Sequence, residues 1–315
     1  MISEFDQSKI RRTDGGLLLI FRELLLRRRA SEVSQRLGLS QSAISHALTR
    51  LRDLFEDPLF IRKSHGFEPT KRALELGPRI ETLIDLIGSA VSEDGRFDPK
   101  RSRRRFGIGS PDSFVTLVGD KLAESFRREA PNATFAARPI FLNRALAAVR
   151  RGEVDIAVGA FDAIPNDLVA ERLLEDEYCV VARRGHPKVK GKMDARSYMT
   201  VGHVFIGQPD GALSDEEPFD RALIDATYGP LPGPKEGINT QAYVSQWETA
   251  MLMVAGSDVV AECPRRLAHK YARKLGLQII DPPYPAFKFV FQSVRRRVED
   301  PGVDWLLARI RAALA

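Results

Sequence analysis

The chain has 315 residues, of which 43% are hydrophobic and 29% charged, a composition typical of a soluble globular protein with two or three compact units. Its net charge of +6 lies in the first third, because residues 1–105 hold 21 Lys and Arg against 15 Asp and Glu, which leaves 27 of each for the rest. This imbalance indicates a polyanionic partner for the first third. The apolar run at residues 17–21 is much shorter than the ~20 residues of a membrane span, and arginines follow it rather than precede it. We therefore expect no signal peptide, no membrane contact and a cytoplasmic location.

The first third is expected to consist of helices and one hairpin. Three helices are predicted, at residues 17–26, 31–37 and 41–55. Ser31 is expected to cap the second helix and Ser40 the third, because serine side chains accept hydrogen bonds from free N–H groups at helix starts. Gly38 allows a tight turn between them, since glycine adopts positive φ at little cost. Asp57-Pro58 ends the third helix.

The second and third helices fit a helix-turn-helix. Ser34 is the small residue where the helices cross, and Gly38 is the turn residue four positions later. The apolar residues expected to lock the helices together are Val33, Leu37, Leu39, Ile44 and Leu48. The polar residues left facing outward are Gln41, Ser42, Ser45, His46, Thr49 and Arg50. In such a motif the second helix enters the major groove, where Gln can pair with adenine and Arg with guanine. The alternative is an ordinary helical hairpin whose polar residues face water.

A short β-hairpin is predicted next, from residues 59–62 and 67–69 around a turn at 64–66. Arg62 and Lys63 near its tip are expected to contact phosphates, which supply affinity but little sequence information. The predicted DNA contacts are therefore these two cations, the outward residues of the third helix, and the helix-start residues Ser31 and Ser40.

A long helix follows at residues 71–92, capped by Thr70. Its apolar residues recur at spacings of three and four and form one stripe: Leu74, Gly77, Ile80, Leu83, Ile84, Ile87 and Val91. No core for so long a stripe is evident in this segment, so we expect a partner helix from a second copy. Residues 93–105 are rich in Gly, Pro and charge and predict a solvated hinge, with extra phosphate contacts as the alternative.

From Phe106 onward strands alternate with helices, which predicts α/β units with mostly parallel sheets. The strands are expected at residues 106–109, 134–140, 154–159, 178–182, 204–206, 259–261 and 287–294. The helices are expected to run through Leu122 to Phe126 and at residues 142–150, 218–226, 244–254, 264–274 and 301–314.

No enzyme signature is found. A nucleophile elbow, a phosphate loop and the His-Glu-x-x-His motif are all missing from the sequence, and the five histidines lack metal-ligand spacing. We therefore predict no catalytic residues, no metal and no cofactor. Cys179 and Cys263 have apolar neighbours and are expected to be small buried core residues, with a redox switch as the alternative.

Several runs resemble the LysR-type transcriptional regulators. In the first third they are residues 36–48 (RLGLSQSAISHAL), Leu51-Arg52, residues 55–62 (FEDPLFIR) and Pro69-Thr70. In the second half they are residues 152–159 (GEVDIAVG), 255–261 (AGSDVVA) and 264–268 (PRRLA). The resemblance covers the chain from about residue 15 and is strongest to the subgroup of flavonoid-responsive nodulation and salicylate-responsive regulators. Ser42 and Ser34 depart from the family, which often has Pro and Ala there.

The resemblance implies a fold of the α + α/β class. A winged helix-turn-helix and a long linker helix would precede two α/β subdomains similar to periplasmic binding proteins, with a small effector between them. The implied boundaries are a DNA-binding domain at residues 1–70, a linker helix and hinge at 71–103, and an effector-binding domain at 104–315. Subdomain I would hold residues 104–172 and 283–315, and subdomain II residues 173–282.

The candidate effector contacts lie in loops at strand ends, where clefts between subdomains usually bind ligands. They are Ser110, Pro111, Asp112, Ser113, Ile140, Phe141, Phe161, Ile206, Gly207, Gln208 and Thr240. The helix start after Ser110 would suit a carboxylate, whereas Asp112 opposes an anion beside it and has capping of its own helix as an alternative role. Phe141 and Phe161 favour an aromatic or apolar ligand.

The sequence thus predicts a transcriptional regulator that binds double-stranded DNA at an interrupted palindrome and is modulated by a small-molecule effector. The resemblance implies dimers joined through helix 71–92 and paired into a homotetramer, with effector binding altering cleft closure, DNA bending and contact with RNA polymerase. The alternative is a DNA-binding repressor or architectural protein without an effector. A stand-alone ligand-binding protein is opposed by the basic first third.

Overall fold

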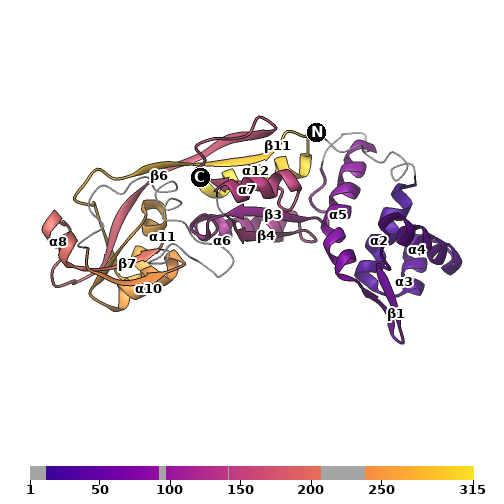
Figure 1. Ribbon diagram of the computed structural model, residues 1–315, viewed down its shortest axis with the longest axis horizontal. Helices are drawn as coiled ribbons and strands as arrows, with labels where there is room; N and C mark the ends of the chain where they lie inside the picture. The colour runs from indigo at the N-terminus through magenta and orange to yellow at the C-terminus, as the bar shows by residue number, and fades with distance from the viewer. Residues whose placement is uncertain (1–11, 92–96, 141, 207–237) are drawn as a thin grey trace. The chain divides into compact units, whose positions relative to one another are not determined.

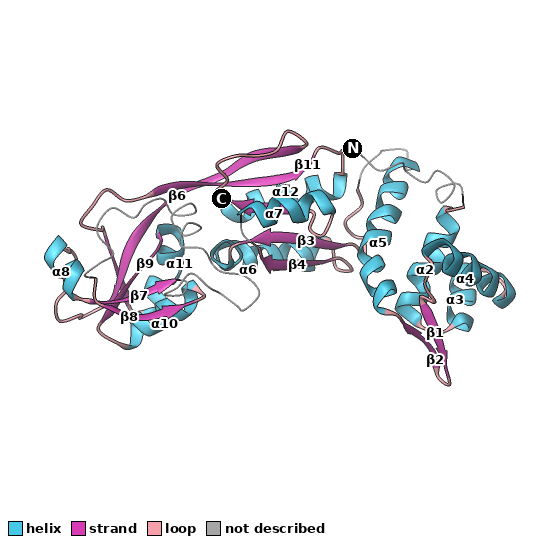
Figure 2. Ribbon diagram, in the orientation of Figure 1, coloured by secondary structure: helices cyan, strands magenta, loops and turns pink. Residues whose placement is uncertain are grey.

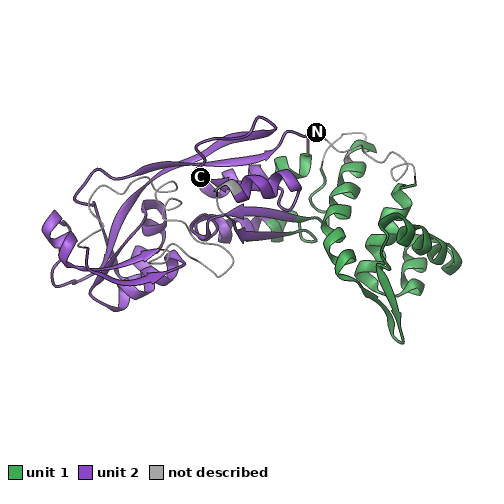
Figure 3. Ribbon diagram, in the orientation of Figure 1, with its two compact units in different colours: residues 1–105, 126–134, 300–305 green, residues 106–125, 135–299, 306–315 purple. Residues whose placement is uncertain are grey.

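The structure is a computed structural model that describes residues 12–91, 97–140, 142–206 and 238–315 (Figure 1). The chain divides into two compact units (Figure 3). Unit 1 holds residues 1–105, 126–134 and 300–305, and unit 2 holds residues 106–125, 135–299 and 306–315. The predictions at Phe141, Gly207, Gln208 and helix 218–226 lie outside the described residues. In the described part of the chain, no helix is both long and apolar enough to cross a membrane.

Unit 1 begins with three helices around one apolar core: α2 (Gly15–Arg27), α3 (Ala30–Leu37) and α4 (Gln41–Phe55). Ser40 caps α4 by accepting the N–H of Ala43 at 3.1 Å, which confirms the predicted cap. Gly38 ends α3 with a φ of 67°, the left-handed conformation that glycine adopts most easily. The buried core includes Phe21 and Leu24 of α2, Val33 of α3, and Ile44 and Leu51 of α4.

Two details of this motif differ from the prediction. The helix α3 begins at Ala30, and its N-cap is Arg29, which makes no side-chain capping bond. Ser31 therefore lies inside the helix and does not cap it. Leu39 was expected to lock the two helices, yet its side chain is 40% exposed because it lies in the turn after Gly38. Val33, Ile44 and Leu48 make the contact instead.

The hairpin consists of β1 (Phe60–Lys63) and β2 (Gly66–Pro69), paired antiparallel with Lys63 opposite Gly66. Arg52 of α4 fixes its base by donating to the carbonyl oxygens of Pro58 at 3.0 Å and Phe60 at 2.8 Å. Gly66 has a φ of 136°, and a Cβ there would collide with the Arg28 carbonyl oxygen. The chain therefore needs glycine at this position to lay the hairpin against the end of α2.

The long helix α5 (Lys71–Val91) carries one apolar stripe, as predicted, but the stripe is buried near the start of the helix and exposed toward its end. Thr70 caps it, as predicted, by accepting the N–H of Ala73 at 3.1 Å. Ala73, Leu76 and Ile80 are buried in the core that α2 to α4 form, so part of the expected dimer stripe packs within the chain. Four apolar side chains of α5 remain exposed by 43 to 78%: Leu74, Leu83, Ile87 and Val91.

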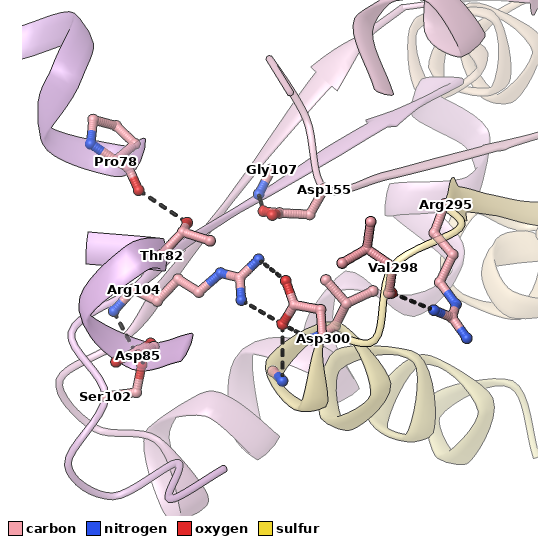
Figure 4. A network of polar contacts seen from close by, with 12 residues as sticks. Pro78, Thr82, Asp85, Ser102, Arg104, Gly107, Asp155, Arg295, Val298 and Asp300 are labelled. Carbon is pink, nitrogen blue, oxygen red and sulfur yellow. Dashed lines mark hydrogen bonds and ion pairs between the residues drawn. The ribbon is translucent and has the colours of Figure 1, made fainter. Parts of the chain in front are cut away.

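The described part of the linker is packed, which corrects the predicted solvated hinge. The Ser102 hydroxyl donates to Asp85 of α5 at 2.6 Å. Arg104 is fully buried and donates to both carboxylate oxygens of Asp300 at 2.7 and 2.9 Å (Figure 4). Asp300 also accepts the N–H groups of Gly302 and Val303, so it caps α12 (Pro301–Leu314). Buried ionic hydrogen bonds thus tie the linker to the start of the last helix.

Unit 2 is built on one mixed sheet with the order β4-β3-β5-β11-β6-β9-β7-β8, and β10 pairs with β6 off this path (Figure 2). Its strands are β3 (Arg105–Ser110), β4 (Thr134–Pro139), β5 (Ile156–Gly159), β6 (Leu168–Arg183), β7 (Gly202–Ile206), β8 (Thr240–Val244), β9 (Val259–Pro264), β10 (Leu277–Ile280) and β11 (Lys288–Arg296). The expectation of a mostly parallel sheet is wrong at its centre. There β11 runs antiparallel to β5 and β6, and β6 runs antiparallel to β9 and β10.

The 16-residue strand β6 divides unit 2 into two lobes. Its residues 168–177 pair with β11, and its residues 178–183 pair with β9 and β10. We call the part with β3, β4, β5, β11 and the first half of β6 lobe I, and the part with β7 to β10 and the second half of β6 lobe II. Two chain segments, near Glu177 and Lys288, thus cross between the lobes.

Helices cover the sheet of lobe I on both faces. Against one face, α7 (Leu142–Arg151) packs on Ala157 and Val294. The second helix of the lobe is α6 (Asp112–Glu129), on which Phe114 packs against Phe291 of β11 with ring centroids 5.6 Å apart. Lobe II carries α8 (Ala195–Thr200), α10 (Trp247–Gly256) and α11 (Arg265–Leu275). Within lobe II, Cys179 and Cys263 lie opposite each other on β6 and β9, both buried and free, which confirms their predicted burial.

The Arg104–Asp300 pair yields a stability prediction. Replacement by Asp300→Ala leaves a buried guanidinium without its partner, so we expect a loss of about 3–5 kcal/mol in the free energy of unfolding, measured by urea denaturation. Burial opposes ionisation of Asp300, but the hydrogen bonds and charge of Arg104 outweigh it and lower the pKa. The pair's contribution is therefore present at neutral pH and is lost as the pH falls through the lowered pKa.

The matched control is the exposed pair of Arg150 and Asp167, whose atoms lie 2.8 Å apart with side chains 56 and 54% exposed. Asp167→Ala should cost less than ~1 kcal/mol, because water screens an exposed pair. Equal losses for the two variants would show that the buried pair does not hold the linker to α12.

Candidate nucleic-acid interface and effector site

The outer face of α4 carries the predicted recognition residues. Because a helix repeats every 3.6 residues, burial of Ile44, Ala47, Leu48 and Leu51 turns the intervening positions outward. All six outward residues of the prediction are exposed: Gln41, Ser42, Ser45, His46, Thr49 and Arg50. The structure therefore gathers them on one polar surface, which we call the α4 face.

The start of α4 adds polar groups to this face. The hydroxyl oxygens of Ser40 and Ser42 lie 2.8 Å apart, and Ser40 also accepts the N–H of Ala43. Helix starts present unpaired N–H groups and a partial positive charge, which suits phosphate oxygens. Ser31 is exposed within α3, so it remains available for such a contact although it caps nothing.

Arg50 already has a partner within the domain. Its guanidinium donates to the Asp14 carboxylate at 3.0 Å and to the Arg12 carbonyl oxygen at 3.3 Å. The other oxygen of Asp14 caps α2 by accepting the N–H of Leu17 at 2.8 Å. Both side chains of the pair are more than half exposed, so its net strength is small, and Arg50 can exchange Asp14 for a base edge or a phosphate.

The hairpin presents its two predicted cations in different settings. Lys63 lies 3.4 Å from Glu68 on the opposite strand, so an acidic side chain partly offsets its charge. Arg62 is exposed, and its side chain forms neither a hydrogen bond nor an ion pair with any described residue. Arg62 is therefore the stronger candidate for a phosphate contact.

In lobe I the candidate effector residues at the end of β3 are mostly buried. Ser110 is 1% exposed, and its hydroxyl has no hydrogen-bond partner among the described residues. On the neighbouring strands, Gly109 pairs with Ala157 of β5, and the next residue of β5, Val158, pairs with Ser293 of β11. The Ser293 hydroxyl is also buried without such a partner. A buried hydroxyl without a partner is unfavourable, so each is suited to a ligand or a water molecule. Ser293 could not be predicted from sequence, because strand pairing alone brings it near β3 and β5.

The apolar candidates of lobe I lie together but against the core. Ile140 and Phe161 are both half-buried and pack on the cluster formed by α7, β5 and β11. The Phe161 ring lies over Gly159, since a Cβ on that glycine would be 3.0 Å from it. The structure therefore brings Ile140 and Phe161 together. Pro111 and Ser113 are buried beside Ser110 at the start of α6.

In lobe II the structure separates two predicted residues. Ile206 ends β7 and pairs with Val244, whereas Thr240 begins β8 and pairs with His203 at the other end of the same two strands. Ligands in parallel sheets bind at the carboxyl ends of strands, so Ile206 occupies the favourable end and Thr240 does not. The helix α10, predicted at residues 244–254, starts at Trp247 just after β8 and so lies at that carboxyl end. None of its residues was among the predicted effector contacts.

Asp112, which the sequence left between an effector contact and a cap of its own helix, contacts the other lobe. It is the first residue of α6, and its carboxylate accepts the N–H of Trp247 in lobe II at 3.4 Å. Glu248, the next residue of α10, accepts the hydroxyl of Thr116 on α6. Contacts between the lobes therefore begin at Asp112, directly after Ser110 and Pro111 in the chain.

A cavity of about 890 Å³ lies elsewhere in unit 2, where α6, β6, α11 and the end of α12 meet. Its lining includes Leu117, Glu175, Arg266 and His269, and none of the predicted effector residues. Among the described residues, no group of three or more His, Cys, Asp or Glu side chains is arranged to hold a metal ion.

Comparison with protein families gives two matches. Residues 16–74 match the model of the bacterial regulatory helix-turn-helix protein, lysR family, and residues 99–315 match the LysR substrate binding domain. The HTH-type transcriptional regulator LinR of Sphingobium indicum is 28% identical over 95% of this chain and 96% of its own. SyrM 1 of Sinorhizobium fredii is 30% identical over 95% of this chain and 85% of its own. The transcriptional activator NagR of a Ralstonia species is 30% identical over 94% of this chain and 96% of its own.

Solved structures share the fold. A probable transcriptional regulator from Pseudomonas aeruginosa superposes with a TM-score of 0.62 at 24% identity, covering 97% of this chain and 98% of that one. A mutant of OxyR from Corynebacterium glutamicum gives a TM-score of 0.61 at 15% identity, covering 96 and 92%. At these identities the likeness concerns architecture alone, and it agrees with the predicted fold class.

The α4 face and the hairpin predict different effects of two arginine substitutions. If Arg50 reads a base, Arg50→Ala should reduce discrimination at one base pair by about 1–3 kcal/mol, measured by competition between an operator fragment and its single-base variants. Asp14→Asn is the control, because asparagine keeps the cap of α2 and releases Arg50, so sequence preference should persist.

Arg62→Ala should instead weaken binding to every sequence by the same factor and reduce the slope of log affinity against log salt concentration by about 0.9. A change of sequence preference in Arg62→Ala would contradict the assignment of the hairpin to phosphates. A uniform loss in Arg50→Ala would contradict base reading by Arg50.

Proposed function

The chain belongs to the LysR family of bacterial transcriptional regulators, and from this premise we propose that it reads its operator with the α4 face and the cations of the β1–β2 hairpin. It is a DNA-binding transcriptional regulator with an effector-binding domain. The observation that carries the proposal is the complete outward exposure of the polar side of α4, next to an exposed and unpartnered Arg62. Chromosomal DNA as the partner supports action in the cytoplasm, as a regulator rather than an enzyme.

The proposed DNA contacts divide by role. Gln41, Ser45, His46 and Arg50 lie along α4, where side chains of a recognition helix meet base edges. The remaining contacts are assigned to the backbone and sugars: Ser31, Ser40, Ser42, Thr49, Arg62 and Lys63. The excess of positive charge in residues 1–105 supports this division, because phosphate neutralisation supplies most of the nonspecific affinity.

We propose that two chains dimerise through the exposed apolar residues of α5. Leu83, Ile87 and Val91 are spaced by four residues, so they form a stripe along one face of the helix. A second copy of the same helix would bury this stripe and place two α4 faces on the half-sites of an interrupted palindrome. Members of the family oligomerise, and pairing of two such dimers into a homotetramer is the assembly that we propose for this chain.

The effector site that we propose lies between the lobes, at the ends of β3 and β5 in lobe I and of β7 in lobe II. The buried, unpartnered hydroxyl of Ser110 supports it, because a ligand would supply the missing hydrogen bond. The apolar surface of Ile140 and Phe161 favours an aromatic or apolar small molecule. Pro111, Ser113 and Ile206 complete the described part of this site. Phe141, Gly207 and Gln208, which lie outside the described residues, and Thr240 remain candidate contacts.

The mechanism follows from the two crossing segments. If an effector binds the closed lobes more tightly than the open lobes, or the reverse, its binding shifts the population of molecules toward the conformation that it binds more tightly. We propose that this shift changes the spacing of the DNA-binding heads, the bend of the DNA and the contact with RNA polymerase. The proposed boundaries are residues 1–70 for DNA binding, 71–103 for the linker and 104–315 for the effector domain. A regulator without an effector is the second candidate, and the match of residues 99–315 to a substrate binding domain disfavours it.

The direct test is binding of the full chain to the DNA upstream of its own coding sequence, titrated with salt and with a panel of small aromatic acids and flavonoids. We expect saturable, salt-sensitive binding that one class of compound changes. Ser110→Ala should raise the compound concentration for half response by about 3- to 10-fold, as loss of one hydrogen bond predicts, without loss of stability.

Ser293→Ala removes the second buried, unpartnered hydroxyl and tests whether the compound also reaches β11. The control is Ser257→Ala, which removes an exposed hydroxyl at the end of α10 and should leave the response to the compound unchanged. Binding that no compound changes would favour the regulator without an effector. Failure to prefer any sequence, on this fragment and on genomic fragments, would contradict the α4 face as a reading surface.

A further inference from the structure

The helix α10 of lobe II begins without a cap of its own. Its N-cap residue, Gln246, makes no side-chain hydrogen bond to the helix. Its first residue, Trp247, donates its backbone N–H to the Asp112 carboxylate of lobe I. An unpaired N–H at a helix start is normally satisfied by a side chain just before the helix. Here the other lobe supplies the acceptor, so the cap exists only while the lobes are in contact.

Further contacts extend this junction along α6. Thr116, one turn after Asp112, donates its hydroxyl to Glu248 of α10. Lys270 of α11 donates to the carbonyl oxygens of Thr116 at 3.0 Å and Leu117 at 2.8 Å, and to Asp120 at 2.7 Å. Asp112, Thr116 and Asp120 are spaced by four, so they share one face of α6. We call the junction of these three residues with Trp247, Glu248 and Lys270 the interlobe seam.

Two carboxyl groups face each other at one end of the seam. Burial and the charge of Glu248 raise the pKa of Asp112 to about 6. Besides Asp112, the charged groups that make hydrogen bonds in the seam are Glu248 from α10, Lys270 from α11 and Asp120 on α6 itself, while Lys121, Arg266 and His269 of α6 and α11 line the neighbouring cavity. Lys270 is bound to Asp120 and lowers its pKa against a small opposing effect of burial. Among the described residues no cation pairs with Asp112 or Glu248, so a proton is what neutralises one of them.

We propose that Asp112 and Glu248 form a proton-dependent lock between the two lobes of the effector domain. With one proton shared between them, the carboxyls attract each other and α10 keeps its cap. Without the proton, two carboxylates oppose each other in a half-buried site and the seam is destabilised. This inference rests on the proposed effector function in one respect, that the two lobes move relative to each other. It concerns the closure of the lobes and not the identity of the compound that binds between them.

The direction of the pH dependence follows from the raised pKa. The locked state binds the proton more tightly than the open state, in which Asp112 has its ordinary pKa of 3.8. The stabilisation is therefore complete below 3.8 and is lost as the pH rises through about 6. Since one pKa unit corresponds to a tenfold change, the ratio of locked to open molecules should fall about tenfold from pH 5 to pH 7.5.

Hydrogen exchange measured by mass spectrometry on the full chain tests the lock without DNA or effector. Protection factors, which correct for the intrinsic effect of pH on exchange, are compared at pH 5, 6 and 7.5 for peptides that cover 112–120 and 247–254. In the wild type, protection at the start of α10 should fall about tenfold over this range. In Asp112→Asn the amide oxygen still caps α10 and the side chain cannot ionise, so protection should stay at its acidic level throughout.

Two further variants keep the outcome unambiguous. Glu248→Gln removes the opposing charge but not the burial of Asp112, so it should reduce the pH dependence without abolishing it. This variant covers the case that Asp112→Asn fails to fold. Asp120→Asn is the matched control from the same face of α6. Its lowered pKa lies below the range tested, so any loss of protection should be equal at every pH.

A wild-type profile without pH dependence would overturn the lock, as would an unchanged dependence in folded Asp112→Asn. Neither result would bear on DNA binding or on the response to compounds, because the measurement uses neither. Conversely, a protein that ignores every compound could still show the lock.

Discussion

Burial of one side of α4 against α2 decides which side chains the protein can offer to DNA. Ile44 and Leu51 are almost fully buried in the core around Phe21, so the helix cannot rotate without exposing them. The polar side of the same helix is thereby fixed outward. The hairpin follows from this arrangement, because Arg52 of α4 holds its base through two carbonyl oxygens. One apolar contact thus positions both the proposed base-reading residues and the proposed phosphate contacts.

A second constraint concerns the linker. The buried pair of Arg104 and Asp300 joins the residues after α5 to the cap of α12, and Ser102 joins them to Asp85 of α5 (Figure 4). The helix α12 continues into unit 2, where Leu306, Leu307 and Ile310 are buried. The interlobe seam joins lobe II to lobe I by hydrogen bonds from α10 and α11 to α6.

The sequence predicted elements whose signals are local. The caps at Ser40 and Thr70, the turn at Gly38 and the periodicity of α4 each involve only a few neighbouring residues, and the structure agrees with them. Ser31 was misassigned because helix starts shift by a residue or two without changing the pattern. The whole stripe of α5 was assigned to a partner helix although Ile80 packs within the chain, since periodicity shows which side is apolar but not what covers it.

Long-range pairing was beyond the sequence. In β6, only the apolar half was recognised, because the half that crosses to lobe I carries alternating charges such as Glu171 and Arg172. The short strands β8 and β10 were missed for lack of length. The seam was missed because Asp112 and Trp247 are 135 residues apart, and neither residue alone signals a contact. The same holds for Ser110 and Ser293, which strand register brings onto one face.

We propose that two α4 faces, paired through α5, read one stretch of DNA. Hydroxyl-radical footprinting of the full chain on a fragment selected from genomic DNA would test this arrangement. We expect two protected segments on one side of the duplex, with centres about one helical turn (~10 base pairs) or a multiple of it apart. A single protected segment, or protection independent of sequence, would contradict it.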